Sequence, residues 1–238
     1  MVVLFDIDET LLDHRTTERA AAAALHRIAR VRRPVGDFVA AWSDALERNF
    51  RRYLAGELSY DDQRRARVRE AVDPELDDDA ADRLLVHYLD AYLAGSALFP
   101  DVLPCLDRLA RGRHRLGIIS NGQSDHQRTK LARCGIADRF ECILISEECG
   151  HHKPAPEIFA QACARMGEPA ARAVYIGDRY DVDAEGARGA GLRGVWLDRG
   201  ARASAEHEPP IISSLDELDA LVPRVPRSSP PRARRLLR

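Results

Sequence analysis

Two carboxylates lie two residues apart, just after the first apolar run of the chain. Asp6 and Asp8 belong to the segment Asp-Ile-Asp-Glu-Thr, which follows Val2–Phe5. Because side chains alternate along extended backbone, both carboxylates lie on one side of it. Two close carboxylates resist joint ionisation, so one can act as an anionic nucleophile while the other carries a proton. This spacing predicts covalent group transfer with general acid assistance.

Further acidic residues indicate a divalent cation near this pair. Asp178 and Asp183 lie in the segment Gly-Asp-Arg-Tyr-Asp-Val-Asp and offer the hard oxygen ligands that Mg²⁺ prefers. A carboxylate that approaches a phosphate dianion is repelled unless positive charge lies close by, and Mg²⁺ together with Lys153 supplies that charge. Ser120 and Asn121, with neighbouring backbone N–H groups, are candidates to hold the remaining phosphate oxygens. The residue types thus favour phosphate as the reacting group.

Lysine is scarce in this chain, which makes its two positions informative. Only Lys130 and Lys153 are lysines among 36 basic residues. Lys153 lies in a His-His-Lys-Pro loop. A compact ammonium group can occupy positions that a planar guanidinium cannot, so we interpret this lysine as placed for chemistry. Lys130 lies within a helical pattern, and we interpret it as an exposed surface charge.

Short apolar runs alternate with helical patterns through most of the chain. They predict an α/β fold, a Rossmann-like parallel sheet with helices on both faces. Asp6, Ser120 and Asp178 each follow one of these runs, and such sheets bind ligands at the carboxyl ends of their strands. The predicted strands are residues 2–5, 116–119, 142–145, 173–176 and 194–197, and the predicted helices are residues 102–111, 125–134, 156–166 and 181–189.

A block without a convincing strand separates the first strand from the rest of the sheet. We expect residues 14–96 to form an inserted α-helical cap domain, and residues 1–13 and 97–222 to form the α/β core domain. The helix starts indicated by capping residues are Thr16 or Thr17, Pro34, Ser59 and Asp77–Asp79.

The net charge of −2 conceals an uneven distribution. Residues 223–238 contain six Arg and no acidic residue, which leaves 30 basic residues against 38 acidic ones in the rest of the chain. A mildly acidic body argues against nucleic acid as a partner. The basic, Pro/Arg-rich end is predicted to be a disordered tail.

The sequence also bears on location. No apolar run approaches the roughly 20 residues of a membrane helix, and no basic segment precedes the first strand, so we expect neither a membrane span nor export. Five cysteines, odd in number and without a CxxC pair, favour a reducing cytoplasm. Cys149 with His151 and His152 lacks a fourth zinc ligand, so we interpret these as loop residues. The oligomeric state stays open.

Four motifs together resemble the haloacid dehalogenase (HAD) superfamily of phosphatases. The signatures of that family are DxDx[TV] after the first strand, Ser or Thr ending the second, Lys before a helix, and GDxxxD or GDxxxxD. In this chain they read Asp6–Thr10, Ser120–Gly122, His152–Pro154 and Gly177–Asp183, in that order. The resemblance covers about residues 1–222, and the helical insertion is similar to the cap of the family.

The resemblance implies catalytic roles for the first motif. Asp6 is then the nucleophile that forms an aspartyl-phosphate. Asp8 protonates the leaving oxygen and later activates water, while Thr10 orients Asp8 or braces the turn.

The resemblance also implies the ligands of phosphate and metal. Ser120 and Lys153 hold the phosphoryl oxygens, with Asn121 as a further candidate. Mg²⁺ is then bound by Asp6, the backbone carbonyl of Asp8 and Asp178, with Asp183 supporting it through water. Asp181 is the alternative to Asp183.

These implications describe a Mg²⁺-dependent phosphatase that hydrolyses a small phosphorylated metabolite such as a nucleotide or sugar phosphate. Three alternatives remain open. A haloacid dehalogenase needs Asp6 but neither Asp8 nor Mg²⁺. A sugar-phosphate mutase keeps every motif, whereas a catalytically idle regulatory module has no need of them. A phosphate-release assay with Mg²⁺ separates these possibilities.

Overall fold

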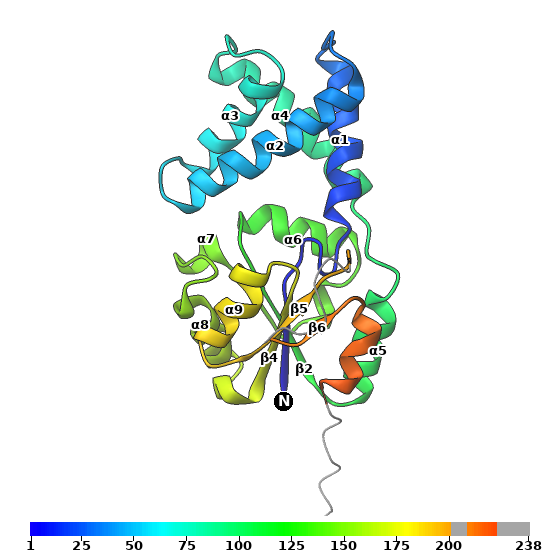
Figure 1. The fold of residues 1–238 in the computed structure, drawn as a ribbon, viewed down its shortest axis with the longest axis vertical. Helices are drawn as coiled ribbons and strands as arrows, with labels where there is room; N and C mark the ends of the chain where they lie inside the picture. Colours follow the sequence, from blue (N-terminus) through cyan, green and yellow to red (C-terminus); the bar gives the residue numbers. More distant parts are fainter. Residues whose placement is uncertain (201–208, 223–238) are drawn as a thin grey trace, which may run out of the picture.

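The computed structural model describes residues 1–200 and 209–222 and contains one six-stranded sheet. All strand pairs are parallel, and the strand order is β3-β2-β1-β4-β5-β6 (Figure 1). The parallel α/β fold is therefore confirmed. The strands are β1 Val2–Phe5, β2 Arg115–Ser120, β3 Cys142–Ile145, β4 Ala173–Gly177, β5 Arg193–Leu197 and β6 Ile211–Ile212.

The predicted strands agree with five of these to within one residue at each end. Only β6 was not predicted, because two residues are too short to give a periodic signal. The helices predicted as residues 102–111, 125–134 and 156–166 agree similarly, whereas the predicted helix 181–189 begins as a π-helical turn and the short helix Ser146–Cys149 was not predicted. The helices are α1 His14–Ile28, α2 Val35–Leu54, α3 Tyr60–Ala71, α4 Asp78–Gly95, α5 Val102–Arg111, α6 Ser124–Arg133, α7 Ser146–Cys149, α8 Pro156–Arg165 and α9 Glu185–Gly189, and the short turns are η1 Ala137–Arg139, η2 Ala170–Arg172, η3 Tyr180–Ala184 and η4 Leu215–Ala220.

The sheet is buried on both faces. In β1, Val3 and Phe5 pack into a cluster with residues of α5 and η4, whereas Val2 and Leu4 pack into a second cluster with residues of α8 and α9. A central strand that is apolar on both faces explains why its sequence is a continuous apolar run instead of an alternating one.

Helices α1 to α4 form a group of their own above the carboxyl ends of the strands (Figure 1). They share a separate hydrophobic cluster, which has Phe38, Trp42 and Tyr88 at its centre. Ser59 and Asp77 cap α3 and α4 as predicted, but the α1 cap is Asp13, which accepts from the backbone N–H of Thr16. No helix in the described ranges is both long and apolar enough to cross a membrane.

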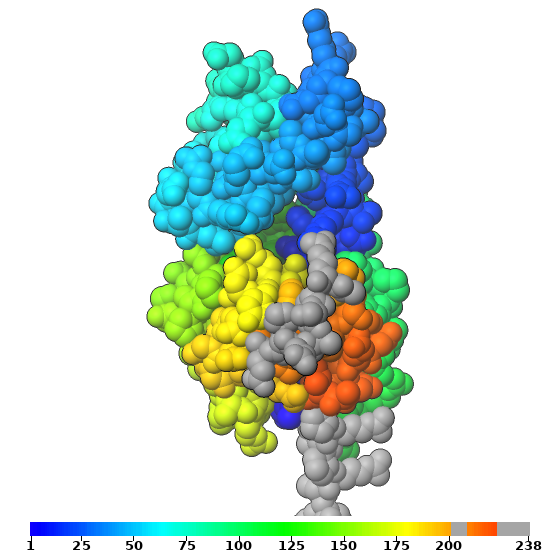
Figure 2. All heavy atoms as spheres, in the orientation of Figure 1, coloured from blue at the N-terminus to red at the C-terminus, as the bar shows by residue number. Residues whose placement is uncertain are grey.

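Two chain segments join these helices to the sheet, and they run side by side. Leu12 and Leu98 form an isolated antiparallel bridge there. In the space-filling view the helical group lies directly on the sheet-containing part (Figure 2). The division into domains at residues 14 and 96 stays a prediction, and the predicted tail, 223–238, lies outside the described residues.

Candidate active site

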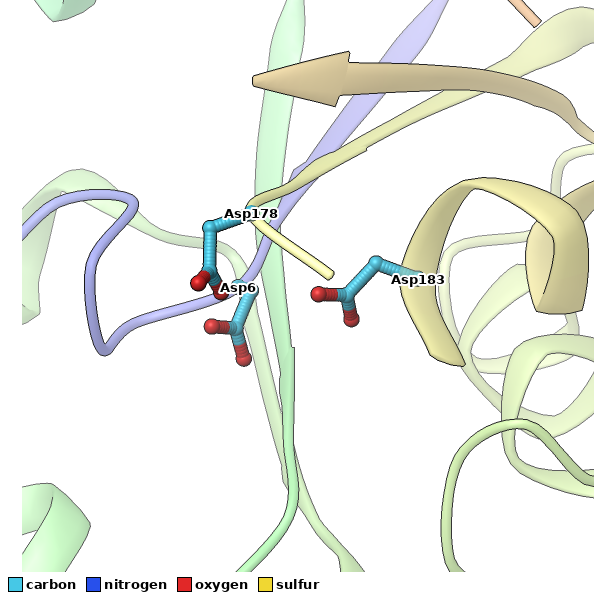
Figure 3. Close-up of side chains that lie close together, drawn as sticks. All are labelled: Asp6, Asp178 and Asp183. Carbon is cyan, nitrogen blue, oxygen red and sulfur yellow. The ribbon is translucent and has the colours of Figure 1, made fainter. Parts of the chain in front are cut away.

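Parallel pairing brings three of the predicted site residues to one edge of the sheet. Phe5 of β1 lies opposite Ile118 of β2 and Ile176 of β4. Asp6, Ser120 and Asp178 therefore lie at the carboxyl ends of three adjacent strands. Figure 3 shows Asp6 and Asp178 from two neighbouring strands, with Asp183 approaching from the adjoining helical turn. The carboxylate oxygens of these three aspartates come within 4.8 Å of one another.

Lys153 is buried at the centre of this group, with 3% of its side chain exposed. Its Nζ donates to Asp6 Oδ1 at 2.6 Å, to Asp183 Oδ1 at 2.7 Å and to the Tyr175 hydroxyl at 2.7 Å. Burial alone would lower the pKa of Lys153, but Asp183 and Asp6 outweigh burial and raise this pKa above its usual value. The lysine that was predicted to lie in a loop therefore forms a buried ion pair with Asp6.

Asp183, not Asp181, is the residue of its segment that joins the site. Asp183 is buried and Asp181 is exposed. Asp183 Oδ2 accepts from the backbone N–H of Arg179 at 3.0 Å. A Cβ atom on Gly177 would lie 2.3 Å from the Asp183 carboxyl carbon, so glycine is required there for Asp183 to fit.

The acidic cluster carries more negative charge than its neighbours neutralise. Burial, opposed by Lys153 and reinforced by Asp183 and Asp8, raises the pKa of Asp6 to about 6. Burial and the neighbouring Asp183 and Asp6 raise the pKa of Asp178 well above its usual value. Close carboxylates with raised pKa values form a donor set that fits a divalent cation, which would relieve their repulsion.

Lys130 corrects one of our predictions. It is buried, with 3% of its side chain exposed, and its Nζ contacts both carboxylate oxygens of Asp8, at 2.6 and 2.7 Å. His14, the first residue of α1, lies 3.8 Å from the same carboxylate. Helix α6 directs Lys130 inward together with Gln127, which is one turn earlier and donates to Asp8 Oδ2 at 3.1 Å. Both lysines of the chain therefore lie in the site.

The two catalytic candidates have pKa shifts opposite to the expected division of labour. Burial would raise the pKa of Asp8, but Lys130, His14 and Gln127 outweigh it and hold that pKa well below its usual value. The pKa of Asp6, in contrast, is raised. The contacts with Lys130 favour an ionised Asp8, and which of the two carboxylates carries the proton during the reaction stays a prediction.

Ser120 and Asn121 both line the cavity, but they make different contacts. Ser120 Oγ accepts from Gln127 Nε2 at 2.8 Å. The Asn121 side chain is engaged with the backbone of Lys153, donating to its carbonyl at 3.0 Å and accepting from its N–H at 2.8 Å. Asn121 therefore fixes the lysine loop in place.

Thr10 is not brought to the cavity. Glu9 has a φ of 59°, and the turn there directs Thr10 back into the core, where it is fully buried. Its hydroxyl has no hydrogen-bond partner within the described part of the chain. Lys130 and Gln127, and not Thr10, orient Asp8.

A cavity of about 610 Å³ extends from these residues up to the helices α1 to α4. The helices contribute Tyr60, Arg64 and Arg67 to its wall. Arg64 donates to the Tyr60 hydroxyl at 3.1 Å and lies 3.1 Å from Nδ1 of His126, which belongs to α6. Sequence reasoning did not place these residues at the site, because nothing in a helical pattern tells which polar side chain turns toward a distant sheet.

The comparisons with known proteins agree in family and differ in activity. A "Glyceraldehyde 3-phosphate phosphatase" of Methanopyrus kandleri is 41% identical over 49% of this chain, which spans about half (50%) of that relative's length. A "Ribulose-1,5-bisphosphate 5-phosphatase" of Halopiger xanaduensis is 31% identical over 85% of this chain and 87% of its own. A solved 2-haloacid dehalogenase from Pseudomonas syringae is 30% identical, with a TM-score of 0.66, and the match covers 93% of this chain and 98% of that one.

The last two relatives have nearly equal identity and different printed activities, so the activity must be argued from the site residues. The family itself is clear. Its sequence model, described as haloacid dehalogenase-like hydrolase, matches residues 1–191. Together with the parallel fold and the four motifs assembled at one edge of the sheet, this match shows that the chain belongs to the haloacid dehalogenase-like hydrolase family.

Proposed function

We propose that this protein is a Mg²⁺-dependent phosphatase that hydrolyses a small-molecule phosphomonoester through an aspartyl-phosphate on Asp6. The observation that carries the proposal is the pairing of each candidate carboxylate with its own lysine. Lys153 lies 2.6 Å from Asp6, and Lys130 lies 2.6 Å from Asp8. A reaction between an anionic nucleophile and an anionic substrate needs this concentration of positive charge.

Asp6, Asp178 and the backbone carbonyl of Asp8 are the groups that we propose to hold Mg²⁺. The raised pKa values of Asp6 and Asp178 support this assignment, because a cation would offset their mutual repulsion. Asp183 is proposed to act through water, since both of its oxygens already accept hydrogen bonds. When bound, Mg²⁺ supplies the positive charge that lets the phosphate dianion approach Asp6.

The first proposed step is attack of Asp6 on phosphorus. Lys153 contacts Oδ1 of Asp6, and the other oxygen, Oδ2, forms the new bond as the ester bond to the leaving oxygen breaks. Lys153 and Ser120 hold the non-bridging oxygens of the phosphoryl group in this step. Fixing these groups in one geometry is itself a large part of the rate increase.

Asp8 is the proposed proton donor in the first step and proton acceptor in the second. In the second step Asp8 takes a proton from the water that attacks phosphorus, and the bond between phosphorus and Asp6 Oδ2 breaks, which releases inorganic phosphate and restores the Asp6 carboxylate. The ionised form of Asp8 favoured by Lys130 is the form required. A phosphate dianion that binds beside Asp8 raises its pKa, which favours the protonated form needed in the first step.

A haloacid dehalogenase is the second candidate, because a relative with that activity is as similar in sequence as the full-length phosphatase relative. Dehalogenation needs the nucleophile Asp6 but has no leaving oxygen to protonate. A lysine, a histidine and a glutamine gathered around Asp8 favour the phosphatase. A sugar-phosphate mutase would use the same contacts, so only an activity assay distinguishes a mutase from a phosphatase.

The cytoplasm is the proposed location. All five cysteines are free, and two of the three buried ones line the hydrophobic cluster between the sheet and α8. Unpaired thiols agree with a reducing compartment.

The test is a parallel assay of the full chain on p-nitrophenyl phosphate and on 2-chloropropionate. We expect phosphate release that requires Mg²⁺ and stops with EDTA, and no release of chloride. Chloride release without phosphate release would overturn the proposal in favour of the dehalogenase. A hexose monophosphate incubated with a trace of the bisphosphate identifies a mutase if its phosphate moves without being released.

A further inference from the structure

Arg67 is a buried cation that faces the cavity without a carboxylate partner. It lies on α3, lines the cavity and is 5% exposed. Its guanidinium carbon lies 4.4 Å from the centre of the Trp42 ring and 4.8 Å from that of Tyr88. Within residues 1–200 and 209–222, no ion pair includes Arg67, and its Nε has no hydrogen-bond partner.

Two other arginines of α3 do have acidic partners. Arg65, two residues before Arg67, is paired with Asp82 at 2.7 Å, and Arg69, two residues after it, is paired with Asp78. A buried charge is costly unless it is paired and hydrogen-bonded, whereas an exposed one gains little from a partner. Contacts with aromatic rings offset only part of that cost. The half-buried Arg65 and Arg69 thus have carboxylate partners, whereas the more deeply buried Arg67 has none among the described residues and faces the cavity.

Glu18 attracts Arg67 through space but forms no ion pair with it. Glu18 is buried and lines the same cavity, but its two oxygens accept from Ser43 Oγ at 2.9 and 3.2 Å, and it lies beyond ion-pair distance of Arg67. Burial lowers the pKa of Arg67 from its usual value, in keeping with a desolvated group that lacks a close counter-charge.

Arg64 adds a second guanidinium to the same wall. It is stacked on Tyr60, 4.3 Å from the ring centre, and its hydrogen bonds go to neutral groups, the hydroxyl of Tyr60 and the amide of Gln123. Burial and the positive neighbours Lys130 and Arg64 lower the pKa of His126 to about 3, so the imidazole it contacts is neutral as well. The guanidinium groups of Arg64 and Arg67 thus line the cavity on the side of helices α1 to α4. Lys153 and Asp6 line it on the opposite side.

We propose that Arg67, assisted by Arg64, binds a second anionic group of the substrate, so that the preferred substrate is a phosphomonoester that also carries a carboxylate or a second phosphate. The proposal rests on the proposed phosphatase activity for the role of the first phosphate. An arriving anion supplies the partner that the buried guanidinium lacks, and a charge-assisted bidentate contact suits the planar fork of arginine. Neutral alcohol and sugar phosphates of similar size leave that partner missing.

The test compares esters that differ only at the end remote from the phosphate. The probes are phosphorylated hydroxy acids of increasing chain length, beginning with phosphoglycolate, the monophosphates of the diols with the same chain, and the bisphosphates of those diols. The proteins are the wild type, Arg67→Met, Arg67→Lys and the control Arg83→Met, which removes an exposed arginine of α4.

For the wild type we expect kcat/KM for the best anionic ester to exceed that for its neutral match by about 10- to 100-fold, the range of a hydrogen bond to a charged group. Arg67→Met should bring the two esters close to parity, whereas Arg83→Met, remote from the cavity, should leave kcat on p-nitrophenyl phosphate within about twofold. Arg67→Lys should restore part of the preference, and Arg83→Met should keep all of it. The carboxylate and bisphosphate series show which anion is preferred.

Equilibrium binding makes the result independent of turnover. The same esters are titrated calorimetrically, with Mg²⁺, into the Asp6→Asn variant and into the double variant Asp6→Asn, Arg67→Met. Tighter binding of the anionic ester that disappears in the double variant supports the anion site even if no phosphate is released. Equal affinities for the paired esters, or an equal loss for both esters in the double variant, would overturn it. Absence of phosphate release from every ester would overturn the proposed function alone.

Discussion

The cavity has a sheet side and a helical side, and the cations of the two sides differ in whether they have fixed acidic partners. On the sheet side, Lys153 contacts three oxygens and Lys130 contacts both oxygens of Asp8, so each cation has fixed partners. On the helical side, Arg67 is also buried and lies over the rings of Trp42 and Tyr88, and it has no ion pair with any residue that the structure describes. The sheet side is organised before any substrate arrives, whereas the helical side leaves its charge to be satisfied by the substrate.

This difference separates chemistry from recognition. Groups that act on the phosphoryl group gain from being held in one geometry, because they meet the same phosphorus and oxygens at each turnover. A group that recognises the remainder of the substrate gains from being unpaired until binding. The two sides are therefore expected to respond differently to substitution.

The largest effect is expected at Asp6. Asp6→Asn is nearly isosteric and removes the attacking carboxylate, so we expect turnover to fall by more than about 10³-fold with the fold retained, as for other catalytic nucleophiles. The measurements are kcat on p-nitrophenyl phosphate and the circular dichroism spectrum. Turnover within an order of magnitude of the wild type would remove Asp6 from the nucleophile role.

Lys153→Arg should give the next largest loss. The variant keeps the charge, but a guanidinium is longer and planar, and it cannot meet Asp6, Asp183 and Tyr175 at 2.6 to 2.7 Å from a single nitrogen. Losing one well-placed electrostatic contact costs about 10²–10³ in kcat. The control is Arg83→Lys, the reverse exchange at an exposed position, and equal kcat values for the two variants would contradict the placement of Lys153.

Lys130→Arg should give a smaller but clear loss, because Lys130 acts through Asp8. Supporting partners of site residues typically contribute about 10- to 100-fold. The loss should be greater for an alkyl phosphate than for p-nitrophenyl phosphate, since only the alkyl leaving group depends on a proton from Asp8. An equal loss on both substrates would assign Lys130 a structural role only.

The smallest effect on catalysis is expected at the start of α3. Ser59 accepts from the backbone N–H of Asp62, and Ser59→Ala should lower the free energy of unfolding by about 0.5–2 kcal/mol, the usual range for an N-cap. Thermal unfolding measures that loss. The kcat on p-nitrophenyl phosphate should not change, and a parallel fall in kcat would show that the two sides of the cavity are not separable.

The sequence predicted the sheet side of the site well, because its residues follow strands. A buried parallel strand is a continuous apolar run, and the residue after it lies at a known edge, which placed Asp6, Ser120 and Asp178 correctly. Asp183 required a choice between two acids, and only the structure decides it, since Asp183 is the one packed against Gly177.

Lys130 could have been found and was not. Its helix places Gln127, Lys130 and Leu131 on one buried face, a spacing that marks the inward side of α6. The scarcity of lysine pointed to the same residue. Arg67, in contrast, has arginines at positions 64, 65 and 69 of the same helix, and only tertiary packing decides which of them loses its solvent.

The most direct test of the account is to look for phosphate on Asp6 itself. Full-length wild type, Asp6→Asn and Asp8→Asn are mixed with p-nitrophenyl phosphate and Mg²⁺, quenched in acid within milliseconds to seconds, digested, and examined by mass spectrometry. We predict one added phosphoryl group on the peptide that contains residue 6 in the wild type, more of it in Asp8→Asn because the activation of water is slowed, and none in Asp6→Asn. Phosphate release by the wild type with no phosphorylated peptide in either the wild type or Asp8→Asn, or a phosphoryl group found on another residue, would contradict the account.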